Sequence, residues 1–125
     1  MVVRFPAAAS SVPESRVAVR LWWGDFSESR AWDIALAVSE AVSNVVRHAY
    51  PQGGGEFELR GDVQDGDLVV EVRDWGVGIH ASSLRAGLGT GLTIIHKVSD
   101  GVVIQDCAPG TLVSLRFSGT RPPGG

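Results

Sequence analysis

Three polar side chains, Glu40, Asn44 and His48, recur at every fourth position of one segment of the sequence. At about 100° per residue, an α-helix would keep all three within about 80° of one another on one face. A carboxylate, a carboxamide and an imidazole grouped in this way suit a metal-phosphate site. Each could equally be an ordinary surface residue, and His48, near the helix end, could simply interact with the helix dipole.

A second candidate element is the segment Asp74-Trp-Gly-Val-Gly78, which follows an apolar strand pattern. A carboxylate at the end of a strand can accept a hydrogen bond from an exocyclic amine such as that of adenine. The glycines at 76 and 78 would let a flat ring lie against the main chain. The same pattern is also that of a simple turn, and Trp75 has no evident role in either interpretation.

A third candidate element is the glycine-rich segment Gly87-Leu-Gly-Thr-Gly91. It opens a predicted helix over residues 90–99, and backbone N–H groups at a helix N-terminus can bind an anion. No Gly-Lys-Ser/Thr follows the glycines, so the segment is not a Walker loop. It also does not follow the first strand of a βαβ unit, which disfavours a dinucleotide fingerprint.

The helix that would carry Glu40 and Asn44 is predicted from about residue 29 to residue 49. Its apolar residues gather on the side opposite these two polar residues, at the helical period. They are Ile34, Val38, Ala41, Val42, Val45 and Ala49. We therefore expect a helix with its back in the core and its polar face toward a ligand or solvent.

The remaining elements follow from alternation, turn residues and helix caps. Ser11 and Gly24 bound a first helix, and Asp65-Gly66 turns a hairpin between two alternating strands. The other expected strands are residues 2–5 at an edge, and residues 102–104 and 111–117 in a last hairpin. The order predicts an α/β (α+β) two-layer sandwich, a mixed and mostly antiparallel sheet with helices on one face.

The bulk properties exclude several classes of protein. The 125 residues carry a net charge of −3 and 44% hydrophobic residues. Without a basic excess, we expect no nucleic-acid partner. No apolar run nears the roughly 18 residues of a membrane helix, no signal-peptide pattern opens the chain, and the single Cys107 suits a reducing cytoplasm. We expect one domain over residues 1–119, a flexible tail over 120–125, a cytoplasmic location and no membrane partner.

The order of these motifs resembles the GHKL, or Bergerat, ATP-binding fold shared by histidine kinases, DNA gyrase and MutL. The resemblance rests on Glu40-x₃-Asn44, Asp74-x-Gly-x-Gly78, the glycine-rich helix start and Gly110-Thr111. The stretches Glu-Ala-Val-Ser-Asn-x₃-His-Ala-Tyr and Gly-Leu-Gly-Thr-Gly-Leu-Thr-Ile-Ile are similar to those of bacterial anti-sigma factor serine/threonine kinases.

The resemblance implies a role for each matching residue. Glu40 would be the catalytic base, Asn44 the Mg²⁺ ligand, and Asp74 the residue that reads the adenine amino group, directly and through water. Thr111 would support Asp74 through its hydroxyl. The remaining ATP-binding residues would be Gly76 and Gly78 at the adenine, Gly87, Gly89, Gly91 and Leu92 around the phosphates, and Arg85 as the nearest candidate to meet the γ-phosphate.

The resemblance also implies a function. The chain would bind ATP with Mg²⁺, phosphorylate a serine or threonine of a small anti-anti-sigma (STAS-type) protein, and sequester a sigma factor, commonly as a homodimer. Two alternatives stay open. The short segment between Ile79 and Gly87 favours a nucleotide-binding switch or adaptor with little kinase activity. A stand-alone catalytic domain of a sensor histidine kinase would instead transfer phosphate to a histidine.

Overall fold

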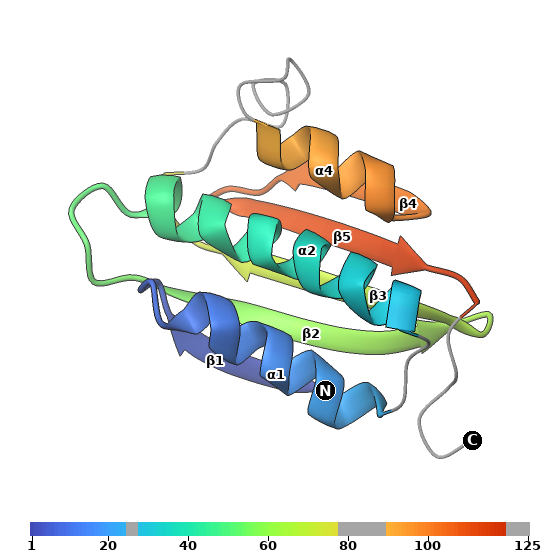
Figure 1. Ribbon diagram of the computed structural model, residues 1–125. Coiled ribbons are helices and arrows are strands. Elements are labelled where there is room, and N and C mark those ends of the chain that lie inside the picture. Colours follow the sequence, from blue (N-terminus) through green and yellow to red (C-terminus); the bar gives the residue numbers. More distant parts are fainter. Residues whose placement is uncertain (25–27, 78–89, 120–125) are drawn as a thin grey trace.

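The computed structural model describes the backbone of residues 1–24, 28–77 and 90–119. Helices α1, α2 and α4 lie side by side over one face of a sheet, with α2 in the middle (Figure 1). In chain order, the elements are β1 (Val2–Pro6), α1 (Ser11–Trp23), α2 (Glu28–Asn44), the π-helical turn η1 (Val45–Ala49), β2 (Glu56–Gln64), β3 (Asp67–Asp74), α4 (Thr90–Val98), β4 (Gly101–Asp106) and β5 (Thr111–Phe117).

The strands of the described ranges form one five-stranded sheet in the order β1-β2-β3-β5-β4. Every neighbouring pair in this order is antiparallel. The short strand β1 is an edge strand, as its sequence predicts, and Asp65-Gly66 makes the β2–β3 turn with φ angles of 53° and 82°. Two positive φ angles in a two-residue loop are the geometry that matches the twist of a hairpin. The two-layer sandwich predicted from the sequence is confirmed, but the described sheet is antiparallel throughout and not mixed.

The core lies between the helices and the sheet. The apolar residues predicted for the back of α2 and its continuation are all at most 5% exposed. Opposite them, the alternation of β2 turns Phe57 and Leu59 inward, and both are fully buried. Other buried side chains of this core include Leu68, Val70, Ile95, Leu115 and Phe117. This packing fixes α2 against β3 and β5, the strands that carry Asp74 and Thr111.

Helix α1 is attached to the sheet at both of its ends. The Ser11 hydroxyl donates a hydrogen bond to the carbonyl of Pro6 at 2.6 Å, at the end of β1. A Cβ on Gly61 of β2 would collide with the Trp22 ring, so this strand position needs a glycine. Gly24 ends the helix with a φ of 92°, as the sequence predicts.

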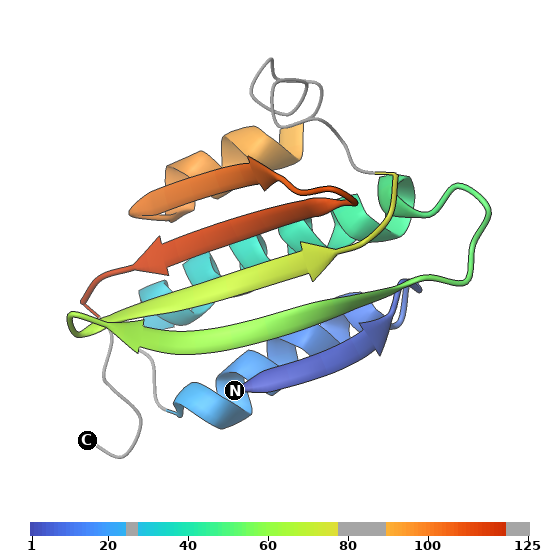
Figure 2. The ribbon, with the colours of Figure 1, turned by 180° about the vertical axis from the view of Figure 1, so that it is seen from behind.

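The other face of the sheet is covered by none of the described helices (Figure 2). It carries pairs of opposite charge across neighbouring strands. The Glu58 side chain is 10% exposed and lies between Arg4, at 3.4 Å, and Arg60. Farther along the sheet, Arg116 contacts Asp67 at 2.8 Å. We call this the charged face. Within the described ranges, no helix is both long and apolar enough to cross a membrane.

Candidate functional site

The helix face predicted to do chemistry lies where α2 passes into the π-helical turn. Glu40 and Asn44 belong to the last turns of α2, and the Glu40 side chain is 26% exposed. The helix then widens into η1. Such π-helical turns are rare in proteins overall, but they occur often at functional sites. Both side chains are therefore partly accessible at the end of a helix whose other side is held in the core.

Arg47 is the residue that joins these two side chains, and the sequence reasoning missed it. Its Nη2 donates to the Asn44 Oδ1 at 3.1 Å and lies 3.9 Å from the Glu40 Oε2. The available signal was its spacing, three residues after Asn44 and seven after Glu40, which places it on the same helix face. His48, which the four-residue spacing favoured, is exposed to solvent.

Asp74 ends strand β3 as a buried acid. It is 5% exposed, and its Oδ1 accepts the Gly76 N–H at 3.0 Å. Burial raises the pKa of this carboxyl above its ordinary value, while hydrogen bonds from the Gly76 and Thr111 backbone N–H groups and the charge of Arg73 act in the opposite direction. A buried carboxylate that main-chain donors hold in place is suited to recognising a further hydrogen-bond donor.

A small cavity joins Asp74 to the end of α2. It is lined by residues of α2, η1, β3 and β5, namely Ala41, Asn44, Val45, Ala49, Asp74, Thr111 and Val113. Its volume is about 20 Å³, enough for one water molecule among polar partners. This fits the predicted contact of Asp74 with adenine through water. Thr111 reaches Asp74 through its backbone N–H, and the predicted role of its hydroxyl stays a prediction.

Two glycines are required by close contacts around Asp74. A Cβ on Gly76 would collide with the Ala49 carbonyl, and the next residue, Val77, donates its N–H to that same oxygen at 2.8 Å. A Cβ on Gly110, whose φ is 91°, would collide with the Asp74 carbonyl. Gly76 thus lets the loop after β3 pack against the end of η1. This structural role is separate from the predicted role of Gly76 in ligand binding.

The other predicted ligand residues divide into two groups. Gly78, Arg85, Gly87 and Gly89 lie outside the described residues. Gly91 and Leu92 lie in the first turn of α4, which begins at Thr90 as the sequence predicts. Backbone N–H groups in the first turn of a helix are those that can bind phosphate.

The described residues fit the cofactors that the sequence implies. The Arg47 guanidinium, itself a cation, contacts both the Asn44 and the Glu40 oxygen atoms, which shows that positive charge is accommodated there. Among the described residues, no three His, Cys, Asp or Glu side chains cluster as a metal site. Mg²⁺ is often held by one or two protein oxygens together with substrate phosphates, and the Asn44 carboxamide offers one such oxygen.

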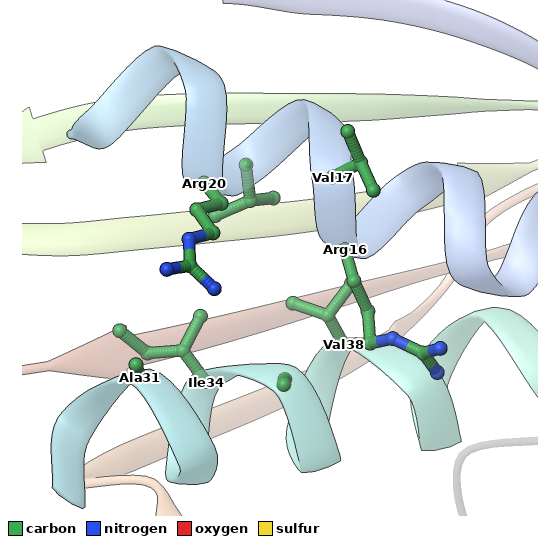
Figure 3. A pocket seen from close by; sticks show the side chains of 8 residues that line it. Arg16, Val17, Arg20, Ala31, Ile34 and Val38 are labelled. Atoms are coloured by element: carbon green, nitrogen blue, oxygen red, sulfur yellow. The ribbon is translucent and has the colours of Figure 1, made fainter. Parts of the chain in front are cut away.

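A separate groove lies on the other side of α2, against α1 (Figure 3). Its volume is about 200 Å³, and its lining consists of Arg16, Val17, Val19, Arg20, Ala31, Ile34, Ala35 and Val38. Figure 3 shows both arginine side chains extending from α1 over an apolar floor that Ile34 and Val38 of α2 contribute. We call it the α1–α2 groove.

Solved structures share this fold. The RsbU and RsbW domains of a Mycobacterium tuberculosis protein match with a TM-score of 0.71 and 22% identity, over 98% of this chain and 34% of that chain. The histidine kinase domain of an Erythrobacter litoralis blue-light activated kinase matches with a TM-score of 0.66 and 22% identity, over 90% of this chain and 61% of that one.

Curated relatives are more similar in sequence. The chain is 32% identical over 96 residues to the anti-sigma F factor of Clostridium acetobutylicum, covering 67% of each chain. It is 35% identical over 100 residues to the serine-protein kinase RsbW of Bacillus mycoides, covering 68% of this chain and 62% of the relative. The match thus spans about two thirds of the length of these relatives.

The family model of the histidine kinase-like ATPase domain matches residues 5–117. This range contains the described strands except the first residues of β1, and it includes Glu40, Asn44, Asp74 and Thr111. The fold, the relatives and the family model agree with one another. The chain therefore belongs to the family of histidine kinase-like ATPase domains.

Proposed function

We propose that this chain is an ATP-dependent serine/threonine protein kinase of the anti-sigma type. It binds ATP with Mg²⁺, phosphorylates a serine or threonine of a small STAS-type anti-anti-sigma protein, and sequesters a sigma factor. Support comes from the relatives named anti-sigma F factor and serine-protein kinase. The observation that carries the proposal is the cavity that Asn44 shares with Asp74, one helical turn from Glu40.

Adenine recognition is assigned to Asp74. Its carboxylate is buried and already accepts main-chain N–H groups, so it is oriented before a ligand arrives. The exocyclic amine of adenine donates hydrogen bonds, and a carboxylate accepts them. Guanine has a carbonyl at the same ring position, which cannot donate. The cavity beside Asp74 leaves room for one bridging water. Gly78 and the phosphate-binding glycines belong to the same proposal.

Phosphoryl transfer is assigned to the polar face of α2. The Glu40 carboxylate accepts the proton of the attacking serine or threonine hydroxyl. The new bond from that oxygen to the γ-phosphorus forms while the bond to the β–γ bridging oxygen breaks, and ADP leaves. Asn44 would hold Mg²⁺ through its carboxamide oxygen, and Mg²⁺ held there would supply positive charge beside the phosphates. Arg47 contacts the same Asn44 oxygen at 3.1 Å and would have to leave it for the metal.

The α1–α2 groove is the proposed docking surface for the sigma factor. It combines an apolar floor with Arg16 and Arg20, so its complement is an amphipathic segment with acidic side chains. It shares no lining residue with the Asp74 cavity, so a partner there leaves the nucleotide cavity free. Because sigma factors act in the cytoplasm, the proposal places the chain there. The expected homodimer stays a prediction.

The test is phosphate transfer by the Glu40→Gln variant. The chain is incubated with a STAS-type protein from the same organism and ATP labelled at the γ-phosphate, with Glu14→Gln, an exposed acid of α1, as the control. We expect acid-stable phosphoserine or phosphothreonine with the wild type and the control. The Glu40 variant should lose at least a hundredfold in rate, because a general base contributes on the order of 10²–10⁴.

Three results would contradict parts of this proposal. Transfer that survives Glu40→Gln would exclude Glu40 as the base. An acid-labile phosphate would indicate a histidine as the acceptor and favour the sensor-kinase alternative. Tight ATP binding without transfer to any partner would favour the switch or adaptor.

A further inference from the structure

Tyr50 is placed where three segments of the chain meet. It follows the π-helical turn directly, and its hydroxyl donates a hydrogen bond to the Glu56 carbonyl at the start of β2. The same oxygen accepts the backbone N–H of Trp75 at 3.0 Å. The Tyr50 hydroxyl thus acts as a hydrogen-bond donor and as an acceptor at the same time.

The Tyr50 ring is held in this position by Gly55. A Cβ on Gly55 would collide with the ring, so the glycine is what allows the ring to lie against the main chain there. The ring is partly buried and packs against the hydrophobic core. The hydroxyl is therefore fixed by packing before it makes its two hydrogen bonds.

Trp75, whose backbone N–H donates one of those bonds, is also held through its ring. The guanidinium carbons of Arg4 and Arg73 lie 4.7 and 4.8 Å from the centre of the indole. Such cation–π contacts stabilise an aromatic ring in one position. With the Val77 N–H bound to the Ala49 carbonyl at 2.8 Å, the backbone on both sides of Gly76 is anchored to η1 and Tyr50.

We propose that Tyr50 is a positioning residue for adenine recognition, acting through Trp75 on Asp74. Asp74 precedes Trp75 and is bonded to the Gly76 N–H, so the main chain held by Tyr50 sets the direction of the carboxylate. Tyr50 itself lines no part of the Asp74 cavity. This inference rests on the proposed assignment of Asp74 to adenine, and it gives Trp75 a role that the sequence did not reveal.

The experiment compares Tyr50→Phe with the wild type for two probes, ADP with Mg²⁺ and tripolyphosphate with Mg²⁺, by calorimetry. Phenylalanine keeps the ring on Gly55 and removes only the hydroxyl. We expect ADP affinity to fall by on the order of tenfold, the effect of one lost hydrogen bond with a stranded N–H. Tripolyphosphate affinity should stay unchanged, because this probe has no adenine.

A second variant and a spectroscopic signal separate positioning from a general loss of structure. Gly55→Ala keeps the hydroxyl but displaces the ring, so it should give the same selective loss. Trp32→Phe, at an aromatic residue that is 69% exposed, should bind both probes as the wild type does. The sequence contains one tyrosine, so 3-fluorotyrosine gives a single ¹⁹F resonance, which ADP should shift and tripolyphosphate should not.

The outcomes are distinct. Equal ADP affinity for wild type and Tyr50→Phe would overturn the positioning role and leave the adenine assignment standing. A parallel loss of both probes would also overturn it, because the effect would then be on the whole site. If the wild type binds tripolyphosphate but not ADP, the adenine assignment fails and this inference fails with it.

Discussion

At the scale of single residues, Asp74 combines a cost to stability with a proposed gain in recognition. The carboxyl is buried, and burial raises its pKa above the ordinary value of 3.8. The folded protein therefore holds this proton to a higher pH than the unfolded chain does. The free energy of unfolding falls as the pH rises from 3.8 through the folded pKa, and at neutral pH the full cost is present.

Asp74→Asn should consequently weaken ADP binding at least tenfold while making the fold more stable at pH 7. The amide keeps an oxygen for the Gly76 N–H, carries no charge to desolvate, and presents a donor to the adenine amine in place of one acceptor. Thermal melts from pH 3 to pH 8 should show the stability gain shrinking as the pH falls. Calorimetry with ADP measures the affinity.

The control for this variant is Asp62→Asn, an exposed acid on the charged face. It should change neither the ADP affinity nor the pH dependence of the melting temperature by a measurable amount. Unaltered ADP affinity in Asp74→Asn would exclude the adenine role, and a loss of stability at pH 7 would show that the ionised carboxylate is needed by the fold itself.

At the scale of elements, the site depends on the junction between η1 and the loop after β3. The Ala49 carbonyl, at the end of η1, accepts the Val77 N–H, and Gly76 lies too close to that carbonyl for a side chain. Gly76→Ala should therefore cost about 1–3 kcal/mol of stability, the range for forced overpacking, and reduce ADP affinity. Urea unfolding and calorimetry measure the two effects.

Gly101→Ala is the matched control for this junction. Its Cβ would lie 3.5 Å from the Arg116 Cβ, an ordinary van der Waals contact, and it stands in β4, outside the cavity. A Gly76→Ala variant as stable as Gly101→Ala would mean that the loop can move away from η1 without cost. In that case the junction would not be the element that holds Asp74.

The helices and strands can be predicted from the sequence because their signals are local. The junction between η1 and the loop after β3 cannot be predicted in this way. Periodicity locates α2 and its buried side, and alternation with Asp65-Gly66 locates the β2–β3 hairpin. The π-helical turn carries no such signal, and it is here that Arg47 and not His48 contacts Asn44. The bond from Trp75 to Tyr50 joins residues 25 positions apart, a pairing that only the folded chain reveals.

At the scale of the whole molecule, α2 contributes to both proposed sites. It lines the α1–α2 groove with Ala31, Ile34, Ala35 and Val38, and its last turns line the Asp74 cavity with Ala41 and Asn44. Helix α1 closes one side and α4 lies on the other (Figure 1). Under the proposal, nucleotide and sigma factor would therefore be bound along successive stretches of one helix.

Arg20→Glu should separate these two activities. Reversing this charge at the groove should weaken sigma-factor binding by about tenfold at low salt, with a smaller effect at high salt because exposed charges are screened. ADP affinity should be unchanged, because the groove shares no residue with the Asp74 cavity. Lys97→Glu, an exposed charge reversal on α4, is the control and should bind the sigma factor normally.

Surface plasmon resonance with an immobilised sigma factor and calorimetry with ADP give the two readouts. If Arg20→Glu and Lys97→Glu weaken sigma-factor binding equally, the effect is one of net charge and the groove is not the docking surface.

The charged face limits the directions in which this domain can be enlarged. Stacking a second sheet on it would bury the nearly enclosed Glu58 with its two arginines and the Arg116–Asp67 pair, and removing such ions from water costs several kcal/mol each. A fused domain, a designed binder or a second copy is therefore better joined along the edge strands β1 and β4 or on the helical side. For an engineer, tags and labels on this face are best placed around the Arg116–Asp67 pair, away from Arg4 and its contact with Trp75.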